Sequence, residues 1–407
     1  MKLLFVHQNF PGQFLHLAPA MQQLGHDVRA ITDATNTKPS DIPTLRYSFR
    51  PPPLDPAATR LGRTFTMMSD RGVVVARFAQ KLRAEGYVPD VIYGHSGWGE
   101  TLFLKEVWPE AKLLVFAEFY YRGLGADVGF DPEFQASGFD QVMIAQSRAA
   151  YLAQALIHAD AGASPTEWQA STHPPVLRDR LEVIFDGVDC DRLAPNPAAR
   201  FSLPDGRVLA PGDEVLTYVA RNLEPYRGFH IFMRALPAIL EARPEARVVI
   251  VGGYEASYGQ LPKQGGTWRD VLLGELGDRL DLSRVHFTGK LPYDRLVDLM
   301  HVSRVHAYLT YPFVLSWSMV EAMAAGALVV GSDTAPVAEV IEDGVTGRLV
   351  DFFDVAGWSD ALIDALARPE AYLPLRAAAR ARVRQRYDLR SICLPRQVDL
   401  LTRLARG

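Results

Sequence analysis

The stretch VHAYLTYPFVLSWSMVEAMAAGALVVGS, residues 305–332, carries the clearest signal of the fold. It begins with the apolar run VHAYLT, which reads as a buried strand ending at Thr310, and it closes with a second such run, ALVVGS. Between them lie a loop with two serines and an apolar helical pattern, so a helix is expected to begin near Ser318. The order strand, helix, strand predicts a parallel βαβ unit.

The same alternation continues along the rest of the chain. Further strands are expected at residues 2–7, 27–32, 90–95, 112–119 and 161–165, then at 215–220, 246–253 and 285–289. A Pro-rich and polar stretch at 194–212 separates the two groups. We therefore predict an α/β chain of two doubly wound Rossmann-like domains, 1–195 and 196–380, that face each other across a cleft. A helical, Arg-rich segment, 381–407, is expected to pack back on the first domain.

The composition narrows the class of protein. The 407 residues are 48% hydrophobic and 22% charged, which is the balance of a globular protein, and the net charge of −4 argues against nucleic-acid binding. Cys190 and Cys393, the only cysteines, provide no disulfide framework or zinc site. We find no apolar run near the ~18 residues of a membrane span. A cytoplasmic protein is expected; peripheral contact with the inner membrane face and the oligomeric state stay open.

The loop before the expected helix in the opening stretch is a candidate anion site. Ser316 or Ser318 can cap the helix, and the free backbone amides near Ser316, Trp317 and Ser318 then point outward at its positive end. Glu321 follows about one turn later, where its carboxylate can accept hydrogen bonds from ribose hydroxyls. The alternative is that Glu321 only stabilises the helix dipole.

Two arginines follow the strand at 215–220. Arg221 comes directly after it and Arg227 lies in a loop closed by Gly228. Guanidinium groups hold phosphate oxygens in pairs and stay charged at any working pH, so both are candidate phosphate ligands. An ion pair of either arginine with Glu224 is the competing interpretation.

The loop after the first strand, HQNFPGQF at 7–14, has a single glycine and lacks the G-x-G-x-x-G pattern of NAD and FAD sites. Gly12 at its tip would let a ligand approach the backbone closely. A simple Pro-Gly tight turn is the alternative.

Two more strand ends carry titratable side chains. His95 ends the strand at 90–95, and Glu118 ends the next one, followed by Phe119, Tyr120 and Tyr121. A carboxylate beside aromatic rings suits acid–base work in a cleft, and the alternative is an ion pair of Glu118 with Arg122 while the rings form core.

A metal site is not expected. Asp189-Cys190-Asp191 spells D-x-D, but it falls in the expected linker, and no H-x-E, H-E-x-x-H or C-x-x-C pattern is present.

Several segments together resemble the family 4 retaining glycosyltransferases of the GT-B fold. The segments ADAGASPTEWQA, FDGVDCDRL, VARNLEPYRG, VHFTGKLPYDRLVDLMHVSRV and EAMAAGALVVGSDTAPVAEVIEDGVTGRLV carry this resemblance over nearly the whole chain. It implies sugar transfer from a nucleotide-diphosphate sugar to an acceptor hydroxyl, with retention of configuration and without metal or cofactor. The acceptor, whether a sugar, a lipid-linked glycan or a small molecule, is not specified.

The resemblance also implies roles for single residues. Arg221 and Arg227 would hold the diphosphate, with Gly12 near it from the other domain. The backbone at Lys290 and Leu291 would meet the base, and Glu321 would bind the ribose.

Three positions depart from the family's pattern. Phe313 stands where the first Glu of E-x₇-E is usual, Arg227 replaces a lysine, and Glu118 stands near the place of an acceptor-side histidine that His95 need not inherit. Tyr120, beside Glu118, is a further acceptor-side candidate. Rival functions are a nucleotide-sugar epimerase or a phosphorylase on a similar frame, and a non-catalytic nucleotide-sugar-binding regulator, which Phe313 keeps open.

Overall fold

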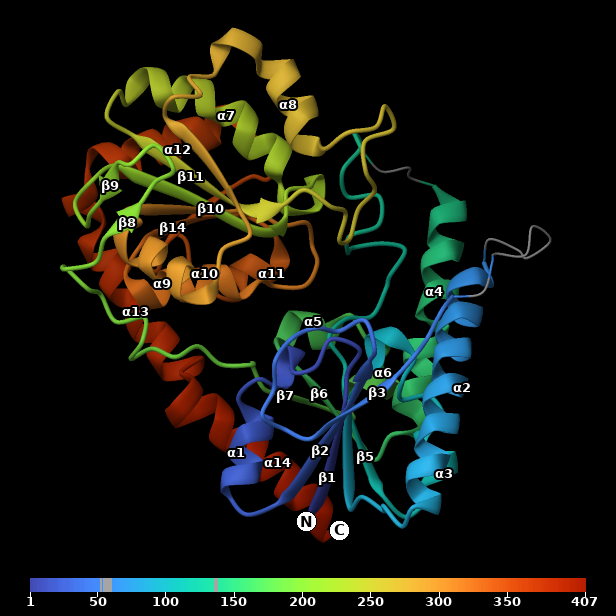
Figure 1. The fold of residues 1–407 in the computed structure, drawn as a ribbon. Helices are drawn as coiled ribbons and strands as arrows, with labels where there is room; N and C mark the ends of the chain where they lie inside the picture. The colour runs from blue at the N-terminus through green and yellow to red at the C-terminus, as the bar shows by residue number, and fades with distance from the viewer. Residues whose placement is uncertain (52, 54–60, 135–137) are drawn as a thin grey trace. The chain divides into compact units, whose positions relative to one another are not determined.

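A computed structural model describes residues 1–51, 53, 61–134 and 138–407 of the chain. These residues form two compact units (Figure 1). Unit 1 consists of Met1–Asp186 and Arg390–Gly407, and unit 2 of Gly187–Leu389. Each unit is built around its own parallel sheet.

The sheet of unit 1 has seven parallel strands in the order β3-β2-β1-β4-β5-β6-β7. Its strands are β1 (Lys2–Val6), β2 (Asp27–Asp33), β3 (Thr44–Tyr47), β4 (Val91–His95), β5 (Lys112–Phe116), β6 (Ala161–Ser164) and β7 (Leu181–Val183). The central strands are apolar and buried on both faces, as parallel strands covered by helices must be. The strand order reverses between β1 and β4, and ligands of such sheets bind at that reversal.

Helices cover both faces of this sheet (Figure 1). The helices of unit 1 are α1 (Leu17–Gln23), α2 (Arg63–Ala84), α3 (Leu104–Val107), α4 (Phe139–His158), α5 (Glu167–Ser171), α6 (Pro175–Arg178) and α14 (Leu394–Arg406). Helices α1 and α14 contact each other, and α2 contacts α3 and α4. Helix α14 brings the C-terminus back beside the N-terminus, through Arg403–Glu182 at 2.8 Å and a bond from Gln397 to the carbonyl of Phe185.

The sheet of unit 2 has six parallel strands in the order β12-β11-β10-β13-β14-β15. Its strands are β10 (Val215–Asn222), β11 (Arg247–Gly253), β12 (Val285–Gly289), β13 (Val305–Tyr308), β14 (Leu328–Ser332) and β15 (Arg348–Val350), with a separate antiparallel pair, β8 (Phe201–Ser202) and β9 (Val208–Leu209). The order reverses between β10 and β13, which is the second expected ligand position.

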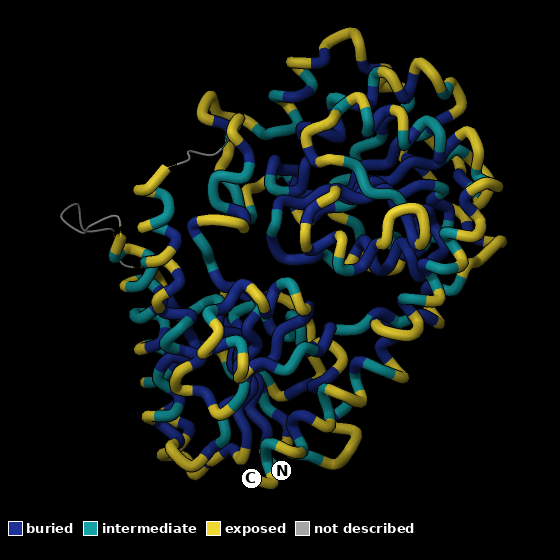
Figure 2. The backbone as a smooth tube through the Cα atoms, turned by 180° about the vertical axis from the view of Figure 1, so that it is seen from behind, coloured by how far each residue is buried: buried dark blue, intermediate teal, exposed yellow. Residues whose placement is uncertain are grey.

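The helices of unit 2 are α7 (Phe229–Ala242), α8 (Trp268–Leu276), α9 (Tyr293–Val302), α10 (Trp317–Ala325), α11 (Ala335–Ala338), α12 (Val355–Ala367) and α13 (Leu373–Arg386). Helices α7 and α12 pack together on one side of the sheet, and α9, α10 and α13 on the other (Figure 1). Figure 2 shows the resulting pattern, with buried strands inside each unit and exposed residues on the outer helix faces.

The structure places the chain's divisions somewhat differently from the expected 1–195, 196–380 and 381–407. The first change of unit falls after Asp186, because Val188 already bridges to Asp388 in unit 2. The second falls after Leu389, because α13 packs on α10 of unit 2 and only α14 joins unit 1. Five short strands were not among those expected from the sequence: β3, β7, β8, β9 and β15.

No helix in the described part of the chain is long and apolar enough to cross a membrane.

Candidate functional site

At the strand reversal of unit 2, the structure brings the loop that carries Phe313, Ser316 and Ser318 beside the segment that carries Arg227. The loop between β13 and α10 and the segment after β10 both leave the sheet at this point. Ser316 is the N-cap of α10, and its hydroxyl accepts from the amide of Ser318 at 3.4 Å. The hydroxyl of Tyr308 in turn accepts from the amide of Ser316 at 2.7 Å. Of the two serines that the sequence offered, Ser316 caps the helix; Ser318 is buried, and Trp317 between them is exposed.

Arg227 is buried and turned toward this loop. Its guanidinium donates to the hydroxyl of Thr310 at 2.8 Å and to the carbonyl of Val314 at 2.7 Å. It also lies over the rings of Tyr258 and Phe313, at 5.1 and 5.8 Å. Burial alone would lower the pKa of this guanidinium, but Tyr308, Tyr258 and Glu224 raise it, so Arg227 stays a cation.

Arg221 is in a different environment. It is exposed at the end of β10, whereas Glu224 three positions later is buried. The Glu224 carboxylate accepts from the amides of Tyr258 at 3.2 Å and Gly259 at 2.9 Å, and more weakly from that of Ser257. Glu224 therefore orders the loop after β11 through backbone amides, while its charge also acts on Arg227.

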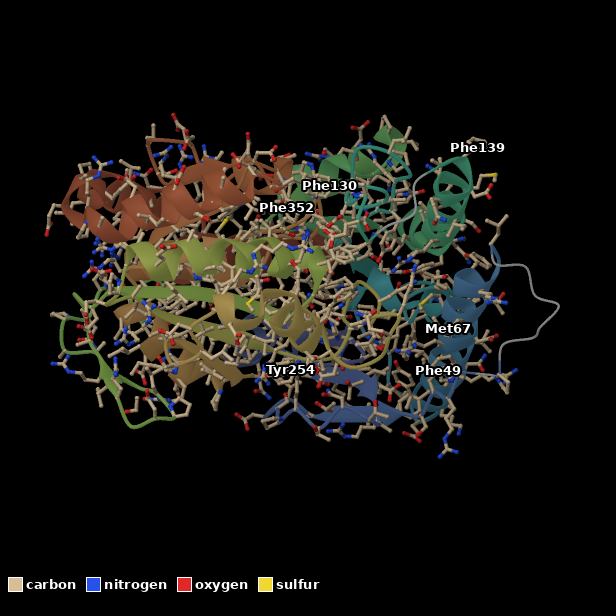
Figure 3. The ribbon with its side chains drawn as sticks, turned by 90° about the horizontal axis from the view of Figure 1, so that it is seen from above. Phe49, Met67, Phe130, Phe139, Tyr254 and Phe352 are labelled. Atoms are coloured by element: carbon tan, nitrogen blue, oxygen red, sulfur yellow. The ribbon has the colours of Figure 1, made fainter. Side chains whose placement is uncertain are left out.

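Phe313 belongs to an aromatic cluster. Its ring is only 3% exposed and packs edge-on against Tyr258 at 4.9 Å and Tyr226 at 5.4 Å. Tyr311 extends the cluster to Phe352, whose position in unit 2 is labelled in Figure 3, at 5.4 Å. Where the resembling family has a carboxylate, this chain has an apolar ring packed into the loop.

Glu321 lies inside α10 and is only 6% exposed. The hydroxyl of Tyr293, the first residue of α9, donates to its Oε1 at 2.9 Å. Burial raises the pKa of Glu321 to about 7, while the Tyr293 hydrogen bond and the charge of Arg192 lower it. A carboxylate held this way can still accept hydrogen bonds at its other oxygen.

The two residues expected to meet a base lie at the end of β12. Lys290 is exposed and its ammonium pairs with Glu255 at 2.9 Å. Leu291 is half-buried and packs against an apolar cluster of unit 2 that includes Phe201, Val249 and Leu299.

At the strand reversal of unit 1, four side chains form a connected polar set, the Glu118 relay. The amide of Asn9 donates to Nδ1 of His7 at 2.8 Å, so Nε2 of the neutral ring carries the proton and donates to Oε1 of Gln13 at 3.0 Å. The Gln13 amide then donates to Oε1 of Glu118 at 3.1 Å. His95 faces the other carboxylate oxygen, with Nε2 at 3.6 Å.

His95 has its proton position fixed in the same way. It caps a short turn, and its Nδ1 accepts from the amide of Gly97 at 2.9 Å, which leaves Nε2–H toward Glu118. The structure brings Glu118, which is 28% exposed, together with His95, a pairing that was not predicted from the sequence. Tyr120 is separate: its ring is buried against His173 at 5.3 Å.

Gly12 has a role that the sequence did not reveal. It has a φ of +49°, and a Cβ there would stand 2.8 Å from Nε2 of His7. The glycine therefore leaves room for the His7 ring that begins the relay.

The buried carboxylate of Glu100 supports the loop that follows β1. Glu100 accepts from the backbone amide of Gln8 at 3.0 Å and from the hydroxyl of Tyr47 at 2.6 Å, and burial raises its pKa to about 7. Arg71 bonds the Gln8 side chain and lies over the ring of Phe49, labelled in Figure 3, at 4.7 Å.

The D-x-D sequence serves a turn. Asp189 accepts from the amides of Asp191 and Arg192, and Asp191 pairs with Arg384 at 3.5 Å. Within the described residues, no three His, Cys, Asp or Glu side chains are grouped as a metal site would need.

Sequence reasoning missed His7, Gln13, Glu224 and Tyr293. His7 could have been found, because it directly follows the first strand, much as His95 ends another. Gln13 and Tyr293 carry no such signal, because their partners are distant in the chain.

Two units that are each built on a parallel sheet covered by helices are typical of the GT-B class. Residues 24–193 match the model of the glycosyl transferase family 4 group, and residues 205–384 match that of the glycosyl transferases group 1. The chain therefore belongs to the glycosyltransferases of family 4, group 1.

Curated relatives are similar over part of the chain. A D-inositol 3-phosphate glycosyltransferase of Nocardia farcinica is 32% identical over 188 residues, which are 46% of this chain and 39% of that protein. A protein of the same name from Mycolicibacterium smegmatis is 30% identical over 209 residues, 50% of this chain and 44% of that one. The match thus spans about two fifths of the relatives' length.

Solved structures share the fold over the full length. Sucrose-phosphate synthase from Thermosynechococcus elongatus superposes with a TM-score of 0.72 at 18% identity, with 100% of both chains covered. Anabaena HepE, solved in complex with UDP and glucose, gives 0.70 at 16% identity, with 99% of both covered.

Proposed function

We propose that this protein transfers a sugar from a nucleotide-diphosphate sugar to an acceptor hydroxyl, with retention of configuration and without a metal. The observation that carries the proposal is the strand reversal of unit 2. There the capped N-terminus of α10 and the exposed guanidinium of Arg221 come with a buried carboxylate, Glu321, one turn further on. The backbone amides and the cation suit the phosphates, and the carboxylate suits the ribose hydroxyls.

The proposed reaction breaks the bond between sugar C1 and the diphosphate oxygen and forms a bond from C1 to the acceptor oxygen on the same face. The acceptor proton passes to the leaving diphosphate, so the products are a glycoside and a nucleoside diphosphate. Arg221 and the α10 amides stabilise the charge that develops on the leaving group. Arg227 supports this indirectly, by holding Thr310 and Val314 of the loop that precedes α10.

The Glu118 relay is the proposed acceptor side. Glu118 offers a partly exposed carboxylate whose Oε1 accepts from Gln13 and whose Oε2 lies 3.6 Å from Nε2 of His95. A hydroxyl of the acceptor can donate to it and be held for attack. Polyhydroxylated acceptors, such as sugars and cyclitols, fit this chemistry.

A nucleotide-sugar-binding regulator is the second candidate, and Phe313 is the observation that favours it. The buried ring leaves no carboxylate at this position to hold the hydroxyls of a donor sugar. Such a protein would bind the donor and neither transfer nor slowly hydrolyse its sugar.

Thermal-shift screening with UDP-, GDP- and ADP-sugars tests donor binding first, because a ligand in excess raises the melting temperature by mass action. The stabilising donor is then incubated alone, and with a panel of polyol and sugar acceptors, in EDTA. We expect glycoside and nucleoside diphosphate only with acceptor. Conversion of the donor sugar without acceptor would indicate an epimerase, and binding without any turnover would indicate the regulator.

A further inference from the structure

Glu321 has an incomplete set of partners for a buried carboxylate. Within the described chain, Tyr293 is the residue that donates a hydrogen bond to it. A carboxylate that is only 6% exposed loses most of its hydration, and a single hydrogen bond does not replace it. The remaining oxygen therefore favours a ligand that brings hydroxyl donors.

Tyr293 is itself held from the other side. Arg192, in the turn that follows Asp189, places its guanidinium over the Tyr293 ring at 4.8 Å and bonds the carboxylate of Asp294. Tyr293 is 44% exposed, so without this contact its ring has little to fix its rotamer. A cation on the ring and a carboxylate at the hydroxyl hold the side chain at both ends.

The direction of the hydrogen bond is also set. Burial beside Glu321 raises the pKa of the Tyr293 hydroxyl, so it remains a donor at any pH at which the protein functions. Because Oε1 accepts from Tyr293, this hydrogen bond restricts rotation of the carboxylate and favours one orientation of Oε2.

We infer that Tyr293 and Arg192 are positioning residues of the ribose site, which fix the Glu321 carboxylate for a cis-diol. This inference rests on the proposed function, in which Glu321 binds the ribose of the nucleotide. It adds that the segment entering unit 2 contributes to nucleotide affinity through Arg192. The ligand feature it recognises is the pair of ribose hydroxyls, whichever base is attached.

Binding measured by calorimetry tests this without knowledge of the acceptor. UDP, GDP and ADP are titrated first, and the tightest is compared with its 2′,3′-dideoxy analogue. We expect Tyr293→Phe to weaken the nucleotide about tenfold, as for a lost hydrogen bond to a charged group, and to leave the dideoxy analogue unchanged. Arg192→Met should weaken the nucleotide about threefold, again with no effect on the analogue.

Tyr372→Phe is the matched control. It removes a tyrosine hydroxyl that bonds the carboxylate of Asp364, also in unit 2, and should leave both affinities unchanged. Adding Tyr293→Phe to Glu321→Gln should cost nothing beyond Glu321→Gln alone, because the tyrosine acts through that carboxylate.

The outcomes separate the inference from the proposed function. If Glu321→Gln weakens the nucleotide while Tyr293→Phe does not, the inference fails and the ribose site stands. If Tyr293→Phe weakens nucleotide and dideoxy analogue equally, Tyr293 only supports the fold and the inference fails. If none of the three nucleotides binds, or Glu321→Gln binds as tightly as the unchanged protein, the ribose site itself fails.

Discussion

The guanidinium of Arg227 donates to the carbonyl oxygen of Val314 at 2.7 Å, and so ties the segment after β10 to the loop before α10. Both bonds come from one nitrogen of the guanidinium, which therefore fixes the loop while its other N–H groups are still able to donate. Arg227 thus supports the loop before α10, whereas Arg221 is exposed; that either arginine holds the diphosphate stays a prediction.

The two arginines should therefore respond differently to removal. Arg227→Ala leaves two buried acceptors, Thr310 Oγ1 and the Val314 carbonyl, without their donor, and should lower the free energy of unfolding by roughly 2–4 kcal/mol. Arg221→Ala should change it by less than about 0.5 kcal/mol, yet slow transfer about a hundredfold. Denaturant unfolding and turnover of the same samples check both. Equal stability of the two variants would contradict the division of roles.

The Glu118 relay should act on the acceptor rather than the donor. Gln13→Leu removes the amide that orients Oε1 of Glu118, so the acceptor kcat/KM should fall about tenfold while donor affinity stays the same. Gln23→Leu, an exposed glutamine on α1, is the matched control and should behave as the unchanged protein. If Gln13→Leu raises the donor Kd and leaves the acceptor kinetics unchanged, the Glu118 relay acts on the donor and the prediction is contradicted.

Gly12 offers a test of the loop that carries the relay. Gly12→Ala meets both a positive φ and the His7 ring, whereas Gly25→Ala has a positive φ of +84° with nothing within 4 Å. Both should lose about 1 kcal/mol of unfolding free energy for the backbone, and Gly12→Ala should lose more and also impair acceptor use. Thermal denaturation gives the comparison. If Gly12→Ala is no worse than Gly25→Ala, the close approach to His7 is unimportant.

Nucleotide affinity should depend on pH through Glu321. Its pKa is raised by burial to about 7, with Tyr293 and Arg192 as the groups that oppose the shift, and only the ionised form accepts from two ribose hydroxyls. Affinity should therefore be full above pH 8 and fall by up to about tenfold per unit as the pH drops below 7. Calorimetry measures UDP binding to the unchanged protein and to Glu321→Gln across this pH range. The ionisation of UDP itself affects both proteins alike, so the difference between the two profiles isolates the contribution of Glu321. Parallel pH profiles of the two proteins would show that Glu321 does not titrate in this range.

The sequence predicted those parts of the fold that depend on local pattern. Apolar runs bounded by turns marked the central strands of both sheets, and the first residue after such a run, like Arg221 or Glu118, had to emerge at the carboxyl edge. Edge strands such as β15, only Arg348–Val350, were too short and too exposed to give this signal.

The pairing of side chains could not be predicted in the same way. Gln13 reaches Glu118, 105 positions away, because the sheet order β1-β4-β5 places the segments after β1 and β5 near each other at one edge of the sheet. No local pattern in the sequence specifies this strand order. Arg227 was expected at phosphate because its type and spacing suit phosphate. Its burial follows from the α10 loop packing over it, which is a property of the assembled unit.

Transfer with retention is tested by the anomeric configuration of the product. The donor selected by thermal shift is incubated with an accepted polyol in EDTA, and proton NMR follows the donor and product anomeric signals. We expect one new glycoside with the configuration of the donor, released together with nucleoside diphosphate and formed about a hundredfold more slowly by Arg221→Ala. A product of inverted configuration, or full activity in Arg221→Ala, would contradict it.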